Sequence, residues 1–377
     1  MKFTVERDRF ADAVAWASRS AATRPIMPHL LGILIEAQEN TLSLSGYDLE
    51  VSSKSLIDAD VLDAGRILVP GRLLAEISRL LPDRPVTLTL DGTKVTVVCG
   101  SARFTLPTLG INEYPALPEL PDASGTISGD LFSAAVAQVA IAAGKDDSLP
   151  VLTGVNVEVE KNTLTLVATD RYRLAVRELA WSSEGNQSTT ALIRGRTLND
   201  AARALAHSDT VSVGLTPANA PEQRVGFAAD GRVMTSRLLD GTFPPYRHLL
   251  PEEASTLVTV EVAPLLEAVR RVALVTEKNI PMRLTFKDES LTLEAGGGGG
   301  DEAAASEEIP ISIEGDAISI AFNAAYLADG LNAVNAPFAQ LAFTAPTKPS
   351  VISPRASADA APDRSYRYLL MPMRYGN

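Results

Sequence analysis

The chain has 377 residues, 46% of them hydrophobic, and a formal net charge of -12. This length and apolar content favour two or three globular domains, each with its own core. No run of about 18 apolar residues is present, which excludes a membrane-spanning helix. The negative charge argues against an ordinary nucleic-acid-binding protein, because affinity for phosphate rests on clustered Lys and Arg.

The cysteine content and the first residues indicate the cell compartment. Cys99 is the single cysteine and cannot form an internal disulfide, which fits a reducing environment. We interpret it as a small apolar residue within a strand. The opening MKFTVERDRF lacks the apolar stretch of a secretory signal. We therefore expect a cytoplasmic protein without a membrane anchor.

The first third of the chain predicts helix, strands, helix and strands in that order. Phe10, Ala13, Val14 and Ala17 follow the i, i+3, i+4, i+7 spacing of an amphipathic helix. The alternating segment 32–44 reads as a β-hairpin, and 73–81 has helical spacing again. Segments 86–90 and 95–98 then flank the turn sequence Asp91-Gly92, which predicts a second hairpin.

The same order recurs twice further along the chain. Segment 154–166 repeats the hairpin of 32–44 at an offset of 122 residues, and 282–293 has the same alternation. Helical stripes precede and follow each hairpin, through Leu131, Phe132, Val136 and Val139, then Leu198, Ala201, Ala202 and Leu205, then Leu265, Leu266, Val269 and Val272, then Tyr326, Leu327, Leu331 and Val334. Three copies of one α+β unit follow, with helices on one face of antiparallel strands.

Proline-rich stretches separate these copies. Tyr114-Pro115 lies in a stretch near 107–122, and Phe243-Pro244-Pro245 lies near 240–256. We predict domains at 1–118, 119–250 and 251–377.

Three phrases carry a resemblance that covers essentially the whole chain. They are Val167-Ala168-Thr169-Asp170-Arg171-Tyr172-Arg173-Leu174-Ala175-Val176, Phe243-Pro244-Pro245-Tyr246 and Met371-Pro372-Met373-Arg374. Together with the three repeats, they resemble the β sliding clamps of bacterial DNA polymerase III, of the actinobacterial type. The resemblance implies a head-to-tail homodimer that forms a ring of six clamp domains around duplex DNA, with helices lining the hole and antiparallel sheets outside. It also implies a non-catalytic processivity subunit without a cofactor, which tethers the replicative DNA polymerase, the clamp loader complex and other clamp-binding-motif proteins.

The distribution of charge is compatible with such a ring. The helical windows 7–19, 71–81, 129–145, 195–207, 263–278 and 323–334 hold eleven Lys or Arg and eight Asp or Glu. These windows carry +3, so the rest of the chain carries -15. A mildly positive bore would contact phosphates without fixing a register on the DNA.

The resemblance also implies a pocket for a short hydrophobic partner peptide between the second and third domains. Its residues would be Leu152, Thr169, Arg171, Tyr172, Arg173, Leu174, Pro244, His248, Leu249, Leu369, Met371, Pro372, Met373 and Arg374, with Asn323 and Tyr326 at the edge. Methionine suits this task because its flexible side chain repacks around different peptides. From the residues alone, Leu152, Leu174 and Leu249 read more readily as core positions, and only the resemblance assigns them to the pocket.

Two positions depart from the commonest family pattern. Arg171 stands where glycine is frequent in other bacterial groups, and Tyr172 stands where histidine is frequent. These changes predict a narrower pocket, and they leave open the alternative of a second, inhibitor-tolerant copy of the clamp. The tail Tyr375-Gly376-Asn377 extends past the Met-Pro-Met-Arg motif and would lie beside the pocket mouth.

DNA contacts and dimer contacts are carried over in the same way. Arg24 matches a loop arginine that contacts the duplex in related clamps, and helix arginines that could face the bore are Arg72, Arg79, Arg196, Arg203, Arg270 and Arg271. Each of these also reads as an ordinary exposed charge. For the dimer, Phe104 and Leu106 would meet Leu274 and Val275 of a second copy, and all four read equally as core residues.

An enzyme is the alternative from another class. His29, His207 and His248 show no metal-ligand spacing, and the glycine run 296–300 precedes Asp301-Glu302 instead of a phosphate-binding Lys-Ser. No Gly-x-Ser-x-Gly motif is present. A repeat scaffold that binds proteins but never DNA is the remaining alternative, and a test of ring closure separates it from a clamp.

Overall fold

The computed structural model describes residues 1–22, 26–184, 188–217, 219–251, 253–276, 280–296 and 303–374. Two compact units divide these residues: unit 1 spans 1–130, 182–185 and 203–238, and unit 2 spans 131–181, 186–202 and 239–377. The middle third of the chain therefore contributes strands to both units.

Each third of the chain has the same order of elements. The first repeat comprises β1 (Lys2–Val5), α1 (Arg7–Ser18), β2 (Gly32–Gln38), β3 (Thr41–Tyr47), β4 (Val51–Asp58), β5 (Asp60–Asp63), β6 (Gly65–Pro70), α2 (Gly71–Leu80), β7 (Val86–Asp91), β8 (Lys94–Cys99) and β9 (Ala102–Pro107). The second comprises β10 (Ala123–Ile127), α3 (Gly129–Ala140), β11 (Gly154–Glu160), β12 (Thr163–Thr169), β13 (Arg173–Ala180), β14 (Ser182–Ser183), β15 (Thr189–Arg194), α4 (Gly195–Ala204), β16 (Val211–Leu215), β17 (Arg224–Ala229) and β18 (Arg232–Arg237). The third comprises β19 (Thr256–Glu261), α5 (Val262–Val272), β20 (Met282–Lys287), β21 (Ser290–Gly296), β22 (Ala304–Pro310), β23 (Ser312–Gly315), β24 (Ile318–Phe322), α6 (Ala324–Val334), β25 (Phe338–Phe343), β26 (Ser350–Arg355) and β27 (Tyr366–Leu370).

Short 3-10 helices complete this pattern. They are η1 (Pro28–Leu31), η2 (Pro150–Thr153), η3 (Arg247–Leu249) and η4 (Ala273–Val275). The first two lie at equivalent places, directly before the first hairpin of their repeats, and each begins with a proline that fixes φ for a helical turn.

All strands pair antiparallel in four sheets. Unit 1 holds the sheets β5-β1-β7-β8-β9 and β14-β10-β16-β17-β18-β4-β3-β2-β6, and unit 2 holds β15-β11-β12-β13-β27-β26-β25-β19-β23 and β22-β21-β20-β24. Successive repeats are joined through the two nine-stranded sheets. The seam between the first two repeats is the pair β18–β4, and the seam between the second and third is β27–β13.

The outer edges of β9 and β22 are the counterparts of these two seams. Among the described residues, no strand pairs with the free edge of β9 or with that of β22. An unpaired edge offers backbone donors and acceptors to another strand.

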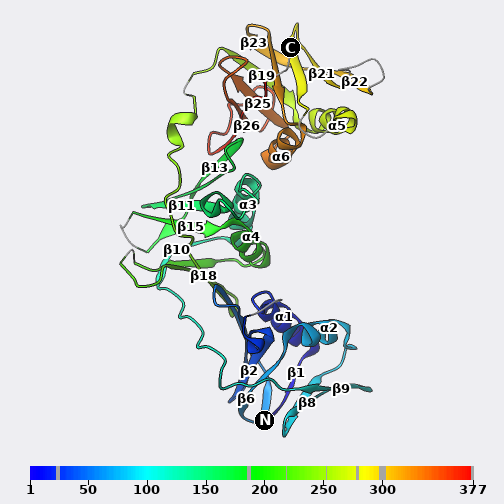
Figure 1. The fold of residues 1–377 in the computed structure, drawn as a ribbon, viewed down its shortest axis with the longest axis vertical. Helices are drawn as coiled ribbons and strands as arrows, with labels where there is room; N and C mark the ends of the chain where they lie inside the picture. The colour runs from blue at the N-terminus through cyan, green and yellow to red at the C-terminus, as the bar shows by residue number, and fades with distance from the viewer. Residues whose placement is uncertain are drawn as a thin grey trace. The chain divides into compact units, whose positions relative to one another are not determined.

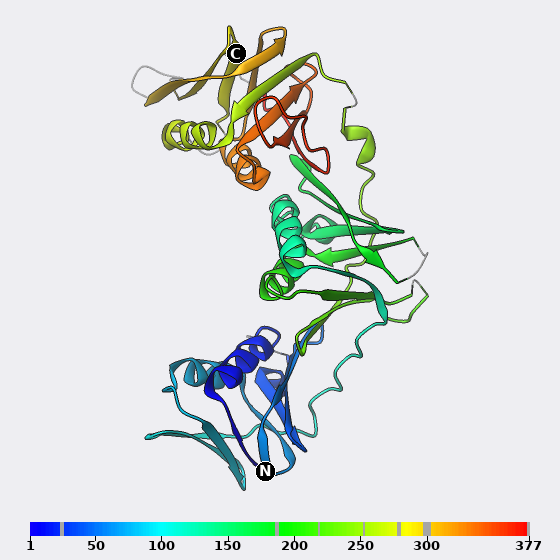
Figure 2. The same cartoon turned by 180° about the vertical axis from the view of Figure 1, so that it is seen from behind.

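Paired helices cover the sheets within each unit, as Figures 1 and 2 show for α1 beside α2 and for α5 beside α6. The Glu6 side chain caps α1 by accepting hydrogen bonds from the backbone N–H groups of Asp8 and Arg9. Phe10, Val14 and Ala17 on the inner face of α1 are fully buried in the first core. The predicted amphipathic stripe therefore determines which side of the helix packs inward.

The three predicted hairpins form as β2–β3, β11–β12 and β20–β21, and the predicted α+β fold class is confirmed. Gly92 in the β7–β8 turn has φ +58°, a left-handed conformation that glycine adopts without strain. The strands β1, β10 and β19 before the first helix of each repeat were not predicted. No helix among the described residues is long and apolar enough to span a membrane.

One backbone hydrogen bond, at an equivalent position in all three repeats, marks the end of each repeat. It runs from a residue after the last strand to the carbonyl oxygen of the residue three before the second helix: Leu109 to Leu68, Leu239 to Leu192 and Met373 to Ala321. In the first two repeats the chain continues from this point into a linker. In the third repeat the equivalent position falls within the terminal Met-Pro-Met-Arg motif.

Candidate functional site

The turn between β12 and β13 places the central residues of the site. The Asp170 carboxylate accepts hydrogen bonds from the backbone N–H groups of Tyr172 and Arg173, and the Thr169 hydroxyl accepts one from Arg171 N–H. Arg171 has φ +78°, a left-handed conformation that is unusual for a residue other than glycine. The equivalent residue of the first repeat, Leu49, has φ +80°, so this turn geometry belongs to the repeat and not to the site alone.

Arg173 joins three segments of unit 2. Its side chain is 5% exposed, and its guanidinium lies 3.0 Å from a carboxylate oxygen of Asp170 and 2.6 Å from one of Asp329. It also lies 4.3 Å from the ring centroid of Tyr326, within range of a cation–π interaction. A buried cation with two carboxylate partners fixes the β12–β13 turn against α6.

Tyr326 and Tyr172 form an aromatic wall above this cation. Their rings are stacked at 6.3 Å between centroids, and Tyr172 is 57% exposed. Burial raises the pKa of the Tyr326 hydroxyl, and the nearby Asp170 charge raises it further, although Arg173 opposes this. Tyr326 therefore stays neutral at physiological pH and serves as an apolar and hydrogen-bonding surface.

α6 packs closely against β27 because Gly330 has no side chain. A Cβ on Gly330 would lie 2.4 Å from the ring of Tyr368, which is buried on β27. The Tyr368 hydroxyl donates to the backbone carbonyl of Tyr326 at 2.8 Å. These contacts hold the first turn of α6, where the Asn323 side chain accepts from Tyr326 N–H as the N-cap.

The terminal segment 371–374 leaves β27 beside Tyr172. Met371 N–H donates to the Tyr172 carbonyl at 2.9 Å, and Met373 N–H donates to the Ala321 carbonyl at 2.8 Å. Met371 and Arg374 are exposed, while Pro372 and Met373 are half-buried.

The linker before the third repeat contributes less than the resemblance implies. Pro244, His248 and Leu249 are exposed, and the latter two lie on η3. Tyr246 is buried against Leu174 and Leu369 in one apolar cluster. These two leucines are therefore core residues and line neither cavity of the site.

Two cavities lie next to the hydrogen bond between Met371 and Tyr172, with Tyr172 lining one and Met371 lining the other. The first, of about 370 Å³, is lined by Leu152, Arg171, Tyr172, Arg173 and Tyr326 among the predicted residues, and also by Ala143, Gly144, Lys145, Asp146, Leu149 and Asp170. The second, of about 820 Å³, is lined by Met371, Pro372, Met373 and Arg374, and also by Arg283, Ser319, Ile320, Ala321, Pro346 and Thr347. We call these two cavities together the cleft.

Several predicted pocket residues do not line either cavity, namely Thr169, Leu174, Pro244, His248, Leu249, Asn323 and Leu369. Sequence reasoning missed five lining residues in the loop 143–149, and it also missed Asp170 and six residues of the second cavity. The signal that could have located this loop was the internal repeat, which places a loop between the first helix and the first hairpin.

The predicted DNA-contacting arginines are exposed on helices, and several have partners. Arg72 Nε donates to Glu76 at 3.0 Å, Arg270 donates to the Asn332 side chain at 3.1 Å, and Arg271 pairs with Glu307 at 2.6 Å and with Glu267. Arg79, Arg196 and Arg203 are exposed. Arg24 and the tail 375–377 lie outside the described residues.

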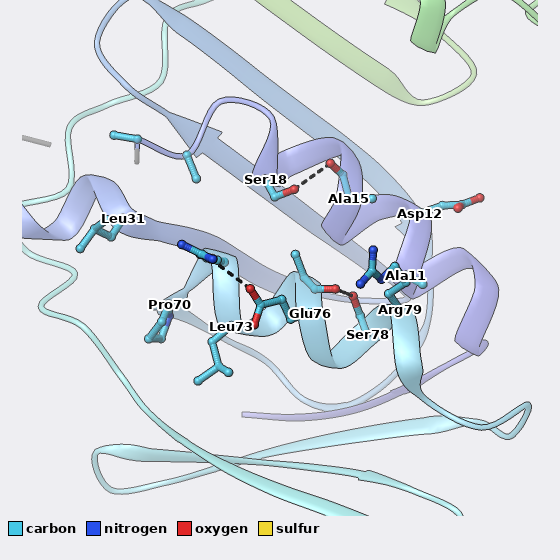
Figure 3. A pocket seen from close by; sticks show the side chains of 15 residues that line it. Ala11, Asp12, Ala15, Ser18, Leu31, Pro70, Leu73, Glu76, Ser78 and Arg79 are labelled. Carbon is cyan, nitrogen blue, oxygen red and sulfur yellow. Dashed lines mark hydrogen bonds and ion pairs between the residues drawn. The ribbon is translucent and has the colours of Figure 1, made fainter. Parts of the chain in front are cut away.

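A groove of about 780 Å³ runs between α1 and α2 (Figure 3). Ala11, Asp12, Ala15 and Ser18 line one side, and Leu73, Glu76, Ser78 and Arg79 line the other. Acidic and basic residues are equal in number in this groove, whereas basic residues outnumber acidic ones in the cleft.

The predicted dimer residues differ in accessibility. Leu274 on η4 is 85% exposed and Phe104 on β9 is 37% exposed, whereas Leu106 is 1% exposed and belongs to the first core. Val275 is half-buried. Among the described residues, no group of His, Cys, Asp or Glu is arranged to hold a metal ion.

Three tandem copies of one α+β domain, with an apolar cleft beside the last repeat, define the class of multi-repeat clamp proteins. Family models of the DNA polymerase III beta subunit match residues 1–118 as the N-terminal domain, 126–245 as the central domain and 247–374 as the C-terminal domain. The chain belongs to this family, and the predicted family is confirmed.

Relatives agree over the full length. The chain is 52% identical to the beta sliding clamp of Streptomyces coelicolor over 375 residues, covering 99% of both chains, and 44% identical to the beta sliding clamp homolog GriR of Streptomyces muensis, covering 100% of both. The crystal structure of the DNA polymerase sliding clamp from Bacillus subtilis has a TM-score of 0.91 at 28% identity, and the match covers both chains completely. The chain is therefore of the actinobacterial type within its family, and the family is one of non-catalytic processivity factors.

Proposed function

We propose that this chain works as a DNA sliding clamp: two copies pair head to tail into a closed ring that encircles duplex DNA and tethers the replicative polymerase. The observation that carries the proposal is the pair of unpaired strand edges, β9 and β22. Each chain offers one edge of each kind, so two copies can satisfy both edges at once and close.

The two seams within the chain indicate which residues would lie opposite each other in the proposed β9–β22 seam between two copies. Val233 lies opposite Lys54 in the β18–β4 seam, and Arg367 lies opposite Val176 in the β27–β13 seam. Val233 and Arg367 each lie six residues before the conserved end-of-repeat hydrogen bond at Leu239 or Met373. Both seams therefore have the same register.

The same register can be applied to β9 and β22. On β9, the residue six positions before Leu109 is Arg103. The hairpin registers β3–β4 and β21–β22 show that Ser306 on β22 is the equivalent of Lys54 on β4. We expect Arg103 of one copy to lie opposite Ser306 of the other.

A cross-seam ion pair follows from this register. In the β27–β13 seam, the Arg367 guanidinium donates to the Glu178 carboxylate, which lies two residues beyond Val176. The equivalent pair between two copies is Arg103 with Glu308. Opposite charges at diagonal positions of neighbouring strands stabilise their pairing.

Phe104 would be buried in this seam. Its counterparts Met234 and Tyr368 are 2% and 0% exposed in the two seams within the chain. Leu274 projects on η4, directly after α5, and α5 packs against β22. Leu106 is buried in the first core and Val275 is half-buried next to Leu274 in η4, so we expect both to contribute indirectly.

Helix arginines would hold the DNA loosely. Arg79, Arg196 and Arg203 are exposed, and phosphate contacts of this kind weaken with salt and read no bases. Retention then comes from closure of the ring, and tethering raises the local concentration of the polymerase at the primer end. This role places the protein in the cytoplasm with the chromosome.

The cleft is the site that we assign to partner peptides. Its apolar lining of Leu149, Leu152, Met371 and Met373 fits a short hydrophobic segment from the polymerase, the clamp loader or other clamp-binding-motif proteins. Domain boundaries at 118 and 250 would leave this cleft between the second and third domains. The comparisons do not favour the alternative of a second, inhibitor-tolerant copy, since the chain is 52% identical to a protein named beta sliding clamp and 44% identical to one named a homolog of it.

Retention on DNA tests the proposal. The protein is loaded onto nicked circular plasmid with a bacterial clamp loader and ATP, and circular and linearised DNA are compared by gel filtration in high salt. We expect retention on the circle and loss from the linear form. Equal behaviour on both would refute topological linkage and favour a scaffold that binds only proteins.

A further inference from the structure

The rim of the cleft is basic in a chain that is acidic overall. Five cationic residues line the two cavities, namely Lys145, Arg171, Arg173, Arg283 and Arg374, against Asp146 and Asp170. Among the described residues, no carboxylate lines the second cavity. The whole chain instead has 46 acidic and 34 basic residues. The reversal is therefore local to the cleft.

Arg173 has a different role from Lys145 and Arg171. Arg173 is buried and neutralised by Asp170 and Asp329, so it serves the structure of the turn. Lys145 and Arg171 are exposed, and no ion pair within 4.0 Å is found for either among the described residues. Their charges therefore remain available to a bound molecule.

Asp146 does not cancel this charge. The Ser148 N–H and hydroxyl engage the Asp146 carboxylate and hold its pKa below the ordinary value, with a smaller contribution from the Arg171 charge. Asp146 is thus committed to its own loop, as an Asx-type turn.

A third cavity extends the basic surface beyond Lys145. This cavity, of about 440 Å³, shares Ala143, Gly144 and Lys145 with the cleft and is lined further by Arg194 and Arg196. Arg194 lies 3.4 Å from Asp147, while Arg196 is exposed at the first turn of α4. A ligand that leaves the apolar cavity past Lys145 would remain on basic surface.

We propose that the cleft selects partner segments in which carboxylates flank the apolar anchor, with Arg171 and Lys145 as the residues that recognise them. The inference rests on the proposed function and specifies the chemistry of the peptide that the cleft binds. An acidic peptide fits better than a nucleic acid, because Leu149, Leu152, Tyr172 and Tyr326 line the same cavity and a phosphate backbone brings no apolar group to them.

Two fluorescent synthetic peptides test this inference by anisotropy. Both carry the same central Leu-Phe anchor; one has Asp on both flanks and the other has Asn at the same places. The native dimer should bind the Asp peptide about tenfold more tightly at low salt, and the preference should shrink as salt screens it. Arg171→Gln should reduce the preference to about twofold, because it should weaken binding of the Asp peptide more than binding of the Asn peptide.

Conservative and matched variants sharpen the test. Arg171→Lys should keep most of the preference, and Lys145→Gln should lower it, whereas Lys287→Gln should leave it unchanged. Lys287 is an exposed lysine on β20 that pairs with Asp288 and lines neither cavity.

The outcomes separate this inference from the proposed function. Equal affinity of the native dimer for both peptides would overturn the inference and leave the cleft assignment intact. Failure of both peptides to bind would overturn the cleft assignment as well. If Arg171→Gln weakened binding of duplex DNA and left the peptide preference unchanged, these cations would serve phosphate and the inference would be wrong.

Discussion

At the scale of single residues, Arg173 stabilises the cleft from below. Its guanidinium bridges Asp170 on the β12–β13 turn and Asp329 on α6, and it supports the ring of Tyr326. If a buried cation loses one carboxylate partner, the remaining interactions no longer offset the free-energy cost of removing the cation from water. Asp329 is half exposed, which moderates the cost.

Asp329→Ala should therefore lower both stability and peptide affinity. We expect a loss of about 1 kcal/mol in the free energy of unfolding, and a twofold to threefold loss of affinity at most, on the order expected for a partly exposed charge pair. Thermal unfolding and anisotropy titration measure the two effects. Asp363→Asn is the matched control, because Asp363 pairs with Arg177 at a similar exposure and lines neither cavity. A peptide affinity lowered equally by both variants would contradict the positioning role of Arg173.

The methionines of the terminal motif are the second prediction at this scale. Met371 and Met373 line the larger cavity together with the apolar residues Ile320, Ala321 and Pro346. Met371→Ala with Met373→Ala should weaken a hydrophobic clamp peptide by about tenfold or more, since each truncation removes buried apolar area. Sedimentation should show that the oligomer is unchanged. Unaltered peptide affinity would place the binding site elsewhere.

At the scale of elements, the cap of α1 gives a prediction with a defined pH dependence. The Glu6 carboxylate accepts from the N–H groups of Arg9 and Asp8, and these hydrogen bonds hold its pKa below the ordinary value of 4.5. A group with a lowered folded pKa stabilises the fold above its ordinary pKa and loses that effect as pH falls through the folded value.

Glu6→Gln should accordingly destabilise unit 1 at pH 7 and have progressively less effect below about pH 4.5. Urea unfolding of both proteins from pH 7 to pH 3 measures this, with the two midpoints converging in acid. A difference that stayed constant over this range would mean that the charge on Glu6 contributes nothing to the cap.

Sequence periodicity predicted the helices and hairpins because each has one buried face, as with Phe10, Val14 and Ala17 on α1. It could not predict the seams. Alternation within β4 predicts a strand but does not identify its partner β18, which lies about 180 residues further along the chain. Strand pairing between repeats is a tertiary property with no local signal. The resemblance placed Tyr172, Arg173 and Met371 at the cleft, where they line its cavities. It also placed Leu174 and Leu369 there, whereas both are buried, and for Leu174 this agrees with the reading from the residues alone as a core position.

At the scale of the whole molecule, the proposed third seam has a charge-reversal test. Arg103→Glu and Glu308→Arg should each shift the protein toward monomers, because each places like charges across the seam. A double variant that carries both reversals should restore the dimer, since each seam then has the inverted ion pair. Sedimentation velocity at micromolar concentration distinguishes these states.

Phe104→Asp is the control for that experiment. It buries a charge in the same seam without an opposite partner, so it should give monomers that the Glu308→Arg change does not rescue. Persistence of the dimer in all these variants would show that β9 and β22 do not form the interface.

The seams within one chain differ from the proposed seam between two copies in how their strands are held near each other. The β18–β4 and β27–β13 seams are tied by continuous chain, so their ends stay near each other whatever the dilution. A β9–β22 seam has no such tether, and its occupancy depends on the concentration of the protein. In the proposed ring, if one such seam parted, the other would still hold the two copies together as an open, linear pair. Reversible opening would therefore be concentrated at the seams between two polypeptides and not at the seams within one.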